Sequence, residues 1–259
     1  MIFQSKTEAR VPEPRTAAPP RSLAPLSAET RIPELSAVMP VYDEEEVLPT
    51  SMAEAVAALE RTCATWELIV VDDGSTDRTP EILDEWARRD ARIRVVRAPE
   101  NRGYARALIL GLSLARHELA FYTDGDGQFD LLELTQLYEH LGNADMVVGY
   151  RRNRRDPALR KLTSWVFNRL QTVILGVHTR DVNCAFKLFT RRYLEKVQLS
   201  SEDYLIDAEM FARARKAGLT WNTVGVTHRP RRAGHSKVHP TTVLTTLREL
   251  WRLRRALRD

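Results

Sequence analysis

Two carboxylates and an amide follow an apolar run near the middle of the chain, in the sequence Asp124-Gly-Asp126-Gly-Gln128. The run before them, 119–123, has the composition of a buried strand, and carboxylates beside a core are costly unless another charge compensates them. Hard divalent cations such as Mg²⁺ and Mn²⁺ prefer such oxygen ligands and usually share them with a substrate phosphate. The segment therefore predicts metal-assisted chemistry on a phosphate-bearing substrate, with an Asp-Gly hairpin turn as the alternative.

The rest of the sequence has to position these groups, and its pattern predicts strands that alternate with helices. The expected strands are 35–41, 67–71, 93–97, 119–123 and 145–149, and the expected helices are 49–63, 80–89, 102–115 and 130–141. Thr79 before Pro80 indicates a helix start with a threonine cap. This alternation favours an α/β fold, a mostly parallel sheet covered by helices on both faces. Because ligands of such sheets bind beyond the carboxyl ends of the strands, the polar residues there are the site candidates.

Two earlier strands also end in acids. After the first strand, Tyr42 could lie against a planar base and Glu44 could accept hydrogen bonds, although acids there could equally favour the positive end of the next helix. After the second, Asp72 and Asp73 follow a buried run, where Asp72 could hold base or ribose donors or form an Asx-type turn. A site this acidic needs a cation and a hydroxyl-rich ligand, and a nucleotide-sugar with a metal supplies both.

Length and composition limit the classes of protein that the chain could be. Its 259 residues, 43% of them hydrophobic, are enough for one sizeable α/β domain. Residues 1–33 are proline-rich and aperiodic, which indicates a disordered tail, followed by a catalytic domain over 34–239 and a basic amphipathic helix over 240–259. Neither a spanning helix nor an apolar leader is recognisable, so a cytoplasmic location is expected. Cys63 and Cys184 lack metal-ligand spacing and are expected to be buried thiols in a reducing compartment.

As a set, the motifs of this chain resemble the inverting glycosyltransferases of family 2, which have the GT-A fold, over about residues 35–240. Within that family they look most like the polyprenyl-phosphate sugar synthases of the dolichol-phosphate mannosyltransferase group. The matching segments are Met39-Pro40-Val41-Tyr42-Asp43-Glu44-Glu45, Val71-Asp72-Asp73-Gly74-Ser75-Thr76-Asp77, Asn101-Arg102-Gly103-Tyr104, Asp124-Gly125-Asp126-Gly127-Gln128, Gly149-Tyr150-Arg151, Asp181-Val-Asn-Cys-Ala-Phe186-Lys187, Asp207-Ala-Glu209 and Arg232-Ala-Gly-His-Ser236-Lys237.

The resemblance implies roles for these residues. It implies a donor that is a GDP- or UDP-hexose and a cofactor that is Mg²⁺ or Mn²⁺. In one respect the chain departs from the subgroup, which often has an apolar residue where Gly127 stands; glycine loosens that turn. The implied nucleoside ligands are Pro40, Tyr42, Glu44, Asp72 and Asp73; the metal and diphosphate ligands are Asp124, Asp126 and Gln128; and a loop closing over the phosphates would bring Arg232, Ser236 and Lys237.

The acceptor decides what further catalytic groups the reaction needs. A hydroxyl acceptor requires a general base, for which Asp207 and Glu209 are candidates in the helix-like stretch 202–216. Two residues apart on a helix, they do not share a face, so one of them is expected to reach the site. A phosphate acceptor is already anionic and needs positive charge instead, which Arg151 and Arg160 could supply; the alternative for Arg151 is a solvated side chain in a basic loop.

Three functions remain to be weighed. The first is hexose transfer to a polyprenyl phosphate, the second is the same donor chemistry on a soluble glycan or small hydroxyl acceptor, and the third is nucleotide or polyanion binding without catalysis. The acids at the strand ends would repel nucleic acid, and no Gly-x-Gly-x-x-Gly follows the first strand, which argues against a Rossmann oxidoreductase. The segments 164–177 and 241–258 combine apolar stripes with tryptophan, so they could lie on an anionic membrane surface or pack on the core or on a second copy of the chain.

Overall fold

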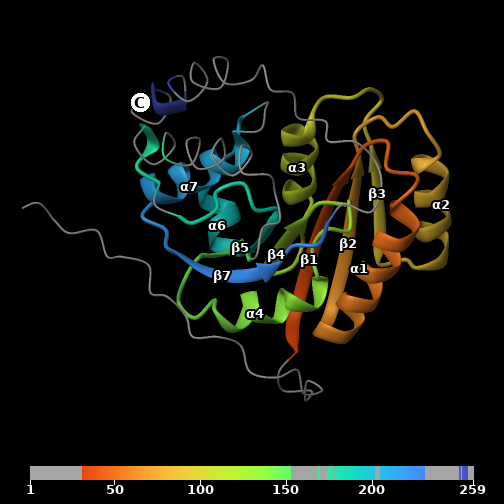
Figure 1. Cartoon of the computed structure of the whole chain (residues 1–259), viewed down its shortest axis with the longest axis horizontal. Helices are drawn as coiled ribbons and strands as arrows, with labels where there is room; N and C mark the ends of the chain where they lie inside the picture. The colour runs from red at the N-terminus through yellow and green to blue at the C-terminus, as the bar shows by residue number, and fades with distance from the viewer. Residues whose placement is uncertain are drawn as a thin grey trace, which may run out of the picture.

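The computed structural model of the chain describes residues 31–152, 169, 174–177, 179–201, 205–230, 251 and 253–255 (Figure 1). Its strands are β1 (Ile32–Val41), β2 (Cys63–Asp72), β3 (Ile93–Arg97), β4 (Leu119–Thr123), β5 (Met146–Arg152), β6 (Phe186–Thr190) and β7 (Trp221–Thr227). Its helices are α1 (Leu48–Thr62), α2 (Thr79–Arg89), α3 (Tyr104–Ser113), α4 (Leu134–Glu139), which follows the 3₁₀ turn η2 (Leu131–Glu133), α6 (Arg191–Lys196) and α7 (Ile206–Lys216).

The described strands form one mixed sheet in the order β3-β2-β1-β4-β6-β5-β7. The first four strands pair in parallel, β6 runs antiparallel to both β4 and β5, and β7 is parallel to β5. It follows that β1, β2, β4, β5 and β7 all point the same way, so their carboxyl ends meet at one edge of the sheet. The start of β6 lies at that same edge, which brings the segment before Phe186 to it.

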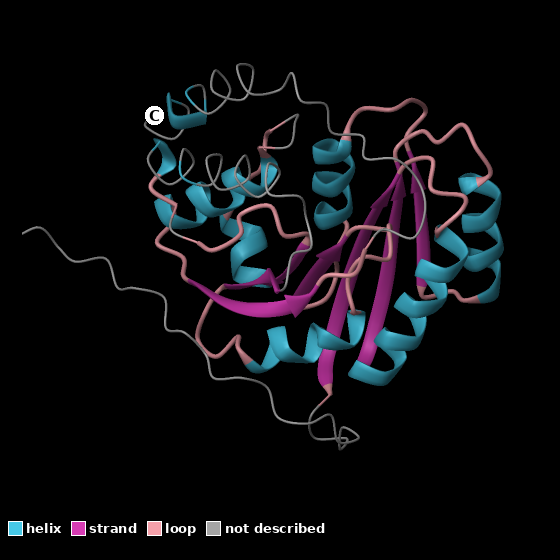
Figure 2. Cartoon of the chain, in the orientation of Figure 1, coloured by secondary structure: helices cyan, strands magenta, loops and turns pink. Residues whose placement is uncertain are grey.

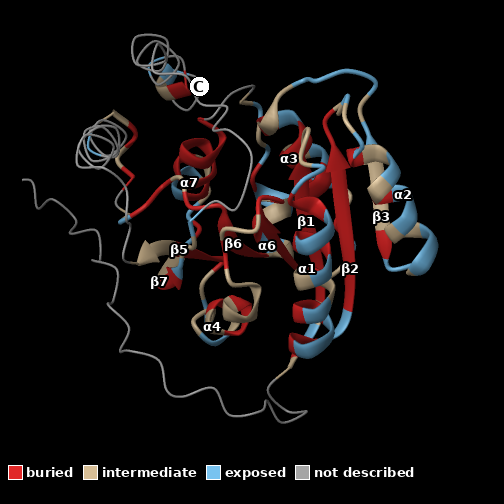
Figure 3. Ribbon diagram, turned by 45° about the vertical axis from the view of Figure 1, so that its right-hand side comes forward, coloured by how far each residue is buried: buried red, intermediate tan, exposed pale blue. Residues whose placement is uncertain are grey.

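Helices cover both faces of this sheet (Figure 2). The helices α1 and α4 lie along one face, and α3, α6 and α7 lie on the other (Figure 1). The central strands β1 and β2 are buried along most of their length, as expected for near-continuous apolar strands of a parallel sheet covered on both faces, whereas the outer side of α2 is exposed (Figure 3). The α/β architecture expected from the alternating pattern is confirmed.

Several boundaries and details differ from the expectation. The strand β1 begins at Ile32, inside the segment assigned to the tail, and the expected helix over 130–141 is divided into η2 and α4. The Thr79 cap is wrong: α2 has no side-chain cap at its start, and the Thr79 hydroxyl instead accepts a hydrogen bond from the Glu44 amide at 3.0 Å. Both Cys63 and Cys184 are buried free thiols, as expected.

Among the described residues, no helix has the length and apolar character needed to cross a bilayer. The two segments expected to be amphipathic, 164–177 and 241–258, lie largely outside the described residues. Within the second, Trp251 is exposed and carries the guanidinium of Arg254 over its ring, while Leu253 is buried.

Candidate active site at the carboxyl edge of the sheet

The loops after β1 and β2 are locked together by hydrogen bonds from backbone and side chains. Asp43 adopts a left-handed backbone conformation with φ +45°, its amide donates to the Ser75 hydroxyl at 2.9 Å, and its carboxylate accepts from the Thr76 amide at 2.7 Å. Asp is among the few residues that tolerate this conformation. The hydrogen bond from the Glu44 amide to the Thr79 hydroxyl joins the same two loops. The expected nucleoside ligands Tyr42 and Glu44 therefore lie on a platform fixed by its own backbone contacts.

Asp72 ends β2 and is almost completely buried. Its Oδ1 accepts a hydrogen bond from the Ser75 amide at 2.9 Å, which is the Asx-type turn considered as the alternative to ligand binding. Its Oδ2 lies 3.8 Å from Nε of Arg97 on the neighbouring strand β3. One oxygen thus shapes the turn and the other faces a cation, so the turn and a role in donor binding are compatible.

Asp73 has a different position from its neighbour. Its two carboxylate oxygens accept hydrogen bonds from the backbone amides of Arg102 at 2.9 Å and Gly103 at 2.8 Å. The side chain thereby ties the end of β2 to the loop that precedes α3. Tyr42 reaches the same loop through its contact with Asn101, and its hydrogen bond to the Asp43 carboxylate raises the pKa of its hydroxyl. Asp73 therefore fixes the loop before α3 beside the site, and a contact between Asp73 and a donor remains a prediction.

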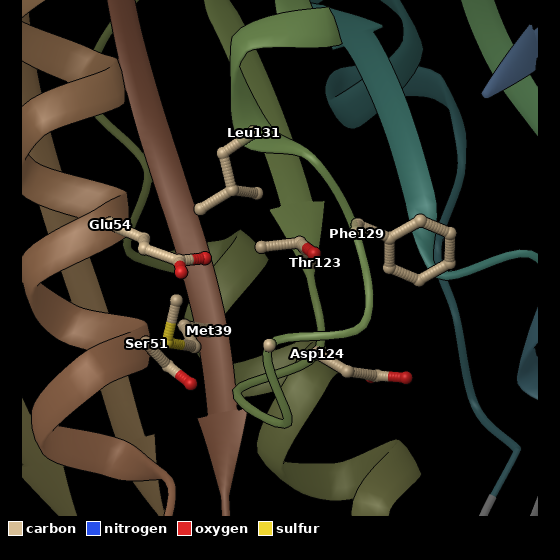
Figure 4. Close-up of a pocket in the computed structure, with 8 residues that line it drawn as sticks. Met39, Ser51, Glu54, Thr123, Asp124, Phe129 and Leu131 are labelled. Carbon is tan, nitrogen blue, oxygen red and sulfur yellow. The ribbon is translucent and has the colours of Figure 1, made fainter. Parts of the chain in front are cut away.

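The predicted metal segment leaves β4 and turns at once. Gly125 is required there, because a Cβ on it would lie 2.6 Å from Cγ1 of Val41 on β1. Asp126 is buried, and its Oδ1 accepts from the Gln128 amide at 3.1 Å. The side chain of Asp124 points away from Ser51 and Glu54 of α1 (Figure 4). The turn therefore places two carboxylates next to each other at the edge where the parallel strands end.

The electrostatics of this pair fit a divalent cation. Burial and the neighbouring charge of Asp126 raise the pKa of Asp124 to about 7, although a hydrogen bond from Tyr104 opposes the rise. The described residues contain no cluster of three acid, imidazole or thiolate groups that would enclose a metal by itself. Two carboxylates that repel each other suit a Mg²⁺ or Mn²⁺ that takes its remaining ligands from water and a substrate phosphate.

A small cavity lies behind this turn, between it and α1 (Figure 4). Gly127, with φ +68°, contributes to its lining, and a Cβ there would lie 3.1 Å from the Ser51 hydroxyl. Thr123 Oγ1 also faces the cavity region and has no hydrogen-bond partner among the described residues. A side chain at Gly127 would therefore be disfavoured by the left-handed backbone and by the close approach to Ser51, although the turn borders an unfilled space.

Gln128 fastens the metal segment to the end of β7. Its side-chain amide donates to the Arg229 carbonyl at 3.0 Å, and the Arg229 amide donates back to the Gln128 carbonyl at 2.7 Å. The Arg229 guanidinium pairs with Glu54 of α1 at 3.1 Å and with Asp130 at 3.2 Å. The expected role of Gln128 as a metal ligand remains a prediction, because its observed contacts are with the protein chain.

Arg151 near the end of β5 lies at the same edge as the acids. Its Nε and Nη2 form a bidentate pair with Asp181 at 2.7 and 2.8 Å. Planar guanidinium–carboxylate pairs of this kind fix the direction of both side chains. The neighbouring Arg180 lies over the Tyr150 ring at 4.9 Å. Arg151 is therefore held by a carboxylate near the site, which argues against the alternative of a freely solvated arginine.

Asp207 and Glu209 are both buried on α7 but face different surroundings, as their spacing indicated. Asp207 accepts from the Tyr122 hydroxyl and from Nζ of Lys187, each at 2.5 Å. Glu209 points elsewhere and accepts from the Ser200 and Ser201 amides and from Nε of Arg213 at 2.6 Å.

Burial acts to raise the pKa of Glu209, but these donors outweigh it and hold the pKa below its usual value. Its contacts make Glu209 a brace for the chain before α7, so the described geometry does not favour it as a base.

Three polar residues of this region were not assigned a role from the sequence, namely Lys187, Tyr122 and Tyr104. Lys187 is fully buried on β6, although lysine is among the residues least often buried. Two sequence signals were available: Lys187 stands within an otherwise apolar strand, Phe186-Lys-Leu-Phe, and both Lys187 and Tyr104 end segments that match the family. Four of the expected phosphate ligands, Arg160, Arg232, Ser236 and Lys237, lie outside the described residues.

Comparisons with known proteins agree with the geometry. Residues 36–198 match the family described as Glycosyl transferase family 2. The chain is 34% identical over 212 residues to the dodecaprenyl-phosphate galacturonate synthase of Rhizobium johnstonii, covering 79% of this chain and 61% of that protein. It is 31% identical over 215 residues to the dolichyl-phosphate beta-glucosyltransferase of Drosophila melanogaster, covering 74% and 66%. The chain thus spans less than two thirds of the length of either relative.

Solved structures with the same fold include two metal-bound sugar transferases. Glucosyl-3-phosphoglycerate synthase of Mycobacterium tuberculosis, in complex with Mn²⁺, UDP and its product, superposes with a TM-score of 0.60 at 18% identity, covering 87% of this chain and 78% of that one. The mannosyltransferase PcManGT of Pyrobaculum calidifontis, with GDP-Man and Mn²⁺, gives a TM-score of 0.58 at 18% identity, covering 88% and 74%. The sheet order and these neighbours confirm the expected GT-A fold. From the family match and the acids at its strand ends, the chain belongs to glycosyltransferase family 2.

Proposed function

We propose that this glycosyltransferase moves a hexose from a GDP- or UDP-hexose to a polyprenyl phosphate, with inversion at the anomeric carbon and with Mg²⁺ or Mn²⁺ as cofactor. The observation that carries the proposal is the placement of Asp72, Asp124 and Asp126 on one side of the edge and of the Arg151–Asp181 pair on the other. One side is suited to a nucleoside diphosphate with its cation, and the other to a second anionic group.

On the donor side, the platform formed by the loops after β1 and β2 would hold the nucleoside. Within that platform, Tyr42 and Asp72 are the residues that we propose as ligands of the base and the ribose. Asp124 and Asp126 would hold the divalent cation, which supplies Lewis-acid neutralisation of the charge on the departing diphosphate. The protein's own contribution is to hold the two carboxylates in place before the donor arrives.

On the acceptor side, the pairing of the described carboxylates favours a phosphate. Asp207 is bound by Lys187 and Tyr122, and Asp181 is bound by Arg151. A carboxylate committed to an ion pair is a poor general base, because the pair must be broken before it accepts a proton. An acceptor phosphate is already an anion and needs no base, and the Arg151 guanidinium, held in place by Asp181, would donate hydrogen bonds to it.

The relatives support the same acceptor class. Their names describe transfer to dodecaprenyl phosphate and dolichyl phosphate, with galacturonate and glucose as the sugars. The neighbours bind UDP or GDP-mannose with Mn²⁺, which is consistent with either base in the donor. Because the sugars differ among these proteins, the hexose transferred by this chain has to be measured.

The test is incubation with a panel of UDP- and GDP-sugars and Mn²⁺, with and without a polyprenyl phosphate, followed by product analysis. A lipid-linked sugar formed with only one donor supports the proposal and identifies that donor. A product formed only with added glycans or small hydroxyl compounds would instead establish the soluble-acceptor alternative. Arg151→Ala is expected to raise the KM for the lipid phosphate about tenfold or more while leaving the donor KM close to wild type. Unchanged KM and turnover would refute the role of Arg151.

We also propose a peripheral position on an anionic membrane surface, through residues 164–177 and 241–258, because the acceptor is a lipid. Apolar stripes with tryptophan among arginines suit an interfacial helix. Flotation with vesicles that contain anionic lipid, compared with neutral vesicles, tests this. Failure of the protein to float with either would refute it, and a stable dimer in solution would favour packing of these segments on a second copy.

A further inference from the structure

Lys187 has three hydrogen-bond partners inside the protein. Its ammonium group donates to the Tyr122 hydroxyl at 2.9 Å, the Cys184 carbonyl at 2.7 Å and Oδ1 of Asp207 at 2.5 Å. A lysine ammonium has three N–H donors, so each donor is matched by one acceptor. Because its side chain is fully buried, these contacts are not shared with bulk water. Lys187 and Asp207 therefore form a fixed ion pair beneath the edge of the sheet.

Two tyrosines lead from this ion pair to the metal carboxylate. The Tyr122 hydroxyl donates to Asp207 at 2.5 Å, and the Tyr104 hydroxyl donates to Oδ1 of Asp124 at 2.9 Å. The two tyrosines lie close enough together that each affects the pKa of the other's hydroxyl. Tyr122 and Tyr104 thus form a path from Lys187 and Asp207 to Asp124.

The proton count makes the members of this path dependent on one another. Each tyrosine hydroxyl has a single proton to donate. If Tyr122 donates to Asp207, Tyr104 is left to donate to Asp124; if Tyr122 turns to Tyr104, Asp207 keeps only the lysine. Burial and the nearby carboxylates raise the pKa of both tyrosines well above the usual value, so both remain protonated donors.

Aromatic packing limits how far these groups can move. The Tyr122 ring stacks on Phe189 at 6.1 Å, and Lys187 Nζ lies 5.1 Å from the centre of the Tyr122 ring and 5.9 Å from that of Phe211. Closely packed side chains hold their rotamers, so the hydroxyl of Tyr122 has one main position. Tyr104 is the first residue of α3.

We propose that Tyr104 and Tyr122 are positioning residues that connect Asp124 to the buried Lys187–Asp207 ion pair and thereby fix the direction in which Asp124 meets the metal. The inference rests on the proposed function, because it assumes that Asp124 is a metal ligand. Residues that orient metal ligands in this way commonly change metal affinity by about 10–100-fold when they are lost. Among the described carboxylates, Tyr104 donates to Asp124 and Tyr122 donates to Asp207, and neither tyrosine binds another.

The experiment measures Mn²⁺ binding in the absence of donor and acceptor, by the electron paramagnetic resonance signal of free Mn²⁺. The variants are Tyr104→Phe, Tyr122→Phe and the double variant, each of which removes only hydroxyl groups. Tyr193→Phe is the matched control, since its buried hydroxyl donates to the Met210 carbonyl at 3.0 Å and forms no hydrogen bond with the described residues of the path. A thermal unfolding curve of each metal-free protein identifies variants that lose affinity through unfolding.

We expect Tyr104→Phe to raise the Mn²⁺ dissociation constant about tenfold. The dissociation constant of the double variant should be within about twofold of that of Tyr104→Phe. Tyr193→Phe should bind as the wild type does. Unchanged or tighter binding by Tyr104→Phe would overturn the inference, as would single losses that multiply in the double variant. Absence of Mn²⁺ binding by the wild type would overturn it as well.

The two proposals can fail separately in this design. If the wild type transfers sugar in the donor panel and Tyr104→Phe binds Mn²⁺ equally well, the positioning role alone is refuted. If the wild type binds Mn²⁺ and Tyr104→Phe does not, but no donor and acceptor pair gives product, the positioning role is retained while the proposed reaction is refuted.

Discussion

Replacing Lys187 by methionine removes the buried positive charge but keeps a side chain of similar length. In the wild type, Nζ of Lys187 lies 2.5 Å from Asp207, and their side chains are 0% and 9% exposed. Methionine leaves the Asp207 carboxylate buried, with the Tyr122 hydroxyl as its remaining side-chain donor among the described residues. Breaking a buried pair in this way costs about 3–5 kcal/mol. Since a whole domain is stable by about 5–15 kcal/mol, Lys187→Met should be folded but marginal.

The matched variant is Lys187→Met combined with Asp207→Asn, which removes both charges and keeps an oxygen to accept the Tyr122 hydrogen bond. The free energy of unfolding should recover by about 2 kcal/mol or more relative to Lys187→Met alone, because no uncompensated charge remains.

The assay is urea unfolding at about pH 8, monitored by tryptophan fluorescence and analysed by linear extrapolation. Lys196→Met, an exposed lysine at the end of α6, is the control and should change the free energy of unfolding by about 0.5 kcal/mol or less. A loss for Lys187→Met of less than about 1 kcal/mol at pH 8 would refute the reasoning. So would a double variant that is less stable than Lys187→Met itself.

Three further predictions follow from the site. Because the pKa of Asp124 is raised to about 7, protons should compete with the metal, and the apparent Mn²⁺ dissociation constant should be about tenfold higher near pH 6 than near pH 8, measured by calorimetry; a flat profile would contradict this. Asp73→Ala should release the loop 101–103 and raise the donor KM more than it lowers kcat in initial-rate assays, whereas a fall in kcat alone would place Asp73 in the chemical step. Glu209→Gln should lower the free energy of unfolding by about 1–3 kcal/mol, since weaker acceptors replace a carboxylate bound by Ser200 and other donors, and it should leave the pH–rate profile unchanged; loss of one limb of that profile would identify Glu209 as a base.

The elements of the first half of the fold could be predicted from the sequence because their signals are local. The strands β1 to β4 are apolar runs separated by amphipathic helices. Their spatial order was not predicted, because β4 pairs with β1 and not with β3. The strands β6 and β7 were not predicted. The five residues of β6 include a lysine, and β6 is held by antiparallel pairing with β4, which lies more than 60 residues earlier in the chain. Such long-range pairing leaves little signal in a short segment.

The residues of the candidate site differ in the same way: some have a local sequence signal and others depend on distant partners. Asp72, Asp124 and Asp126 could be predicted because a residue that follows a buried parallel strand must lie at the ligand-binding edge. Lys187 could not, because a lysine is ordinarily a surface residue and its reason for burial, Asp207, is 20 residues away on a helix that packs over the sheet. Tyr104 belongs to the same class, since its partner Asp124 meets it only in the folded chain.

The sequence also could not tell which acids bind the protein and which are left to bind something else. Asp73 and Glu209 differ little from Asp124 as residues, yet backbone amides engage the carboxylates of the first two. The two kinds of surroundings shift the pKa of the carboxyl group in opposite directions. Its many donors hold the pKa of Glu209 below the usual value despite burial, so the folded protein already stabilises its charge. Burial and Asp126 raise the pKa of Asp124, so a nearby cation would stabilise its charge. For this reason we propose that Glu209 supports α7 and that Asp124 holds the metal.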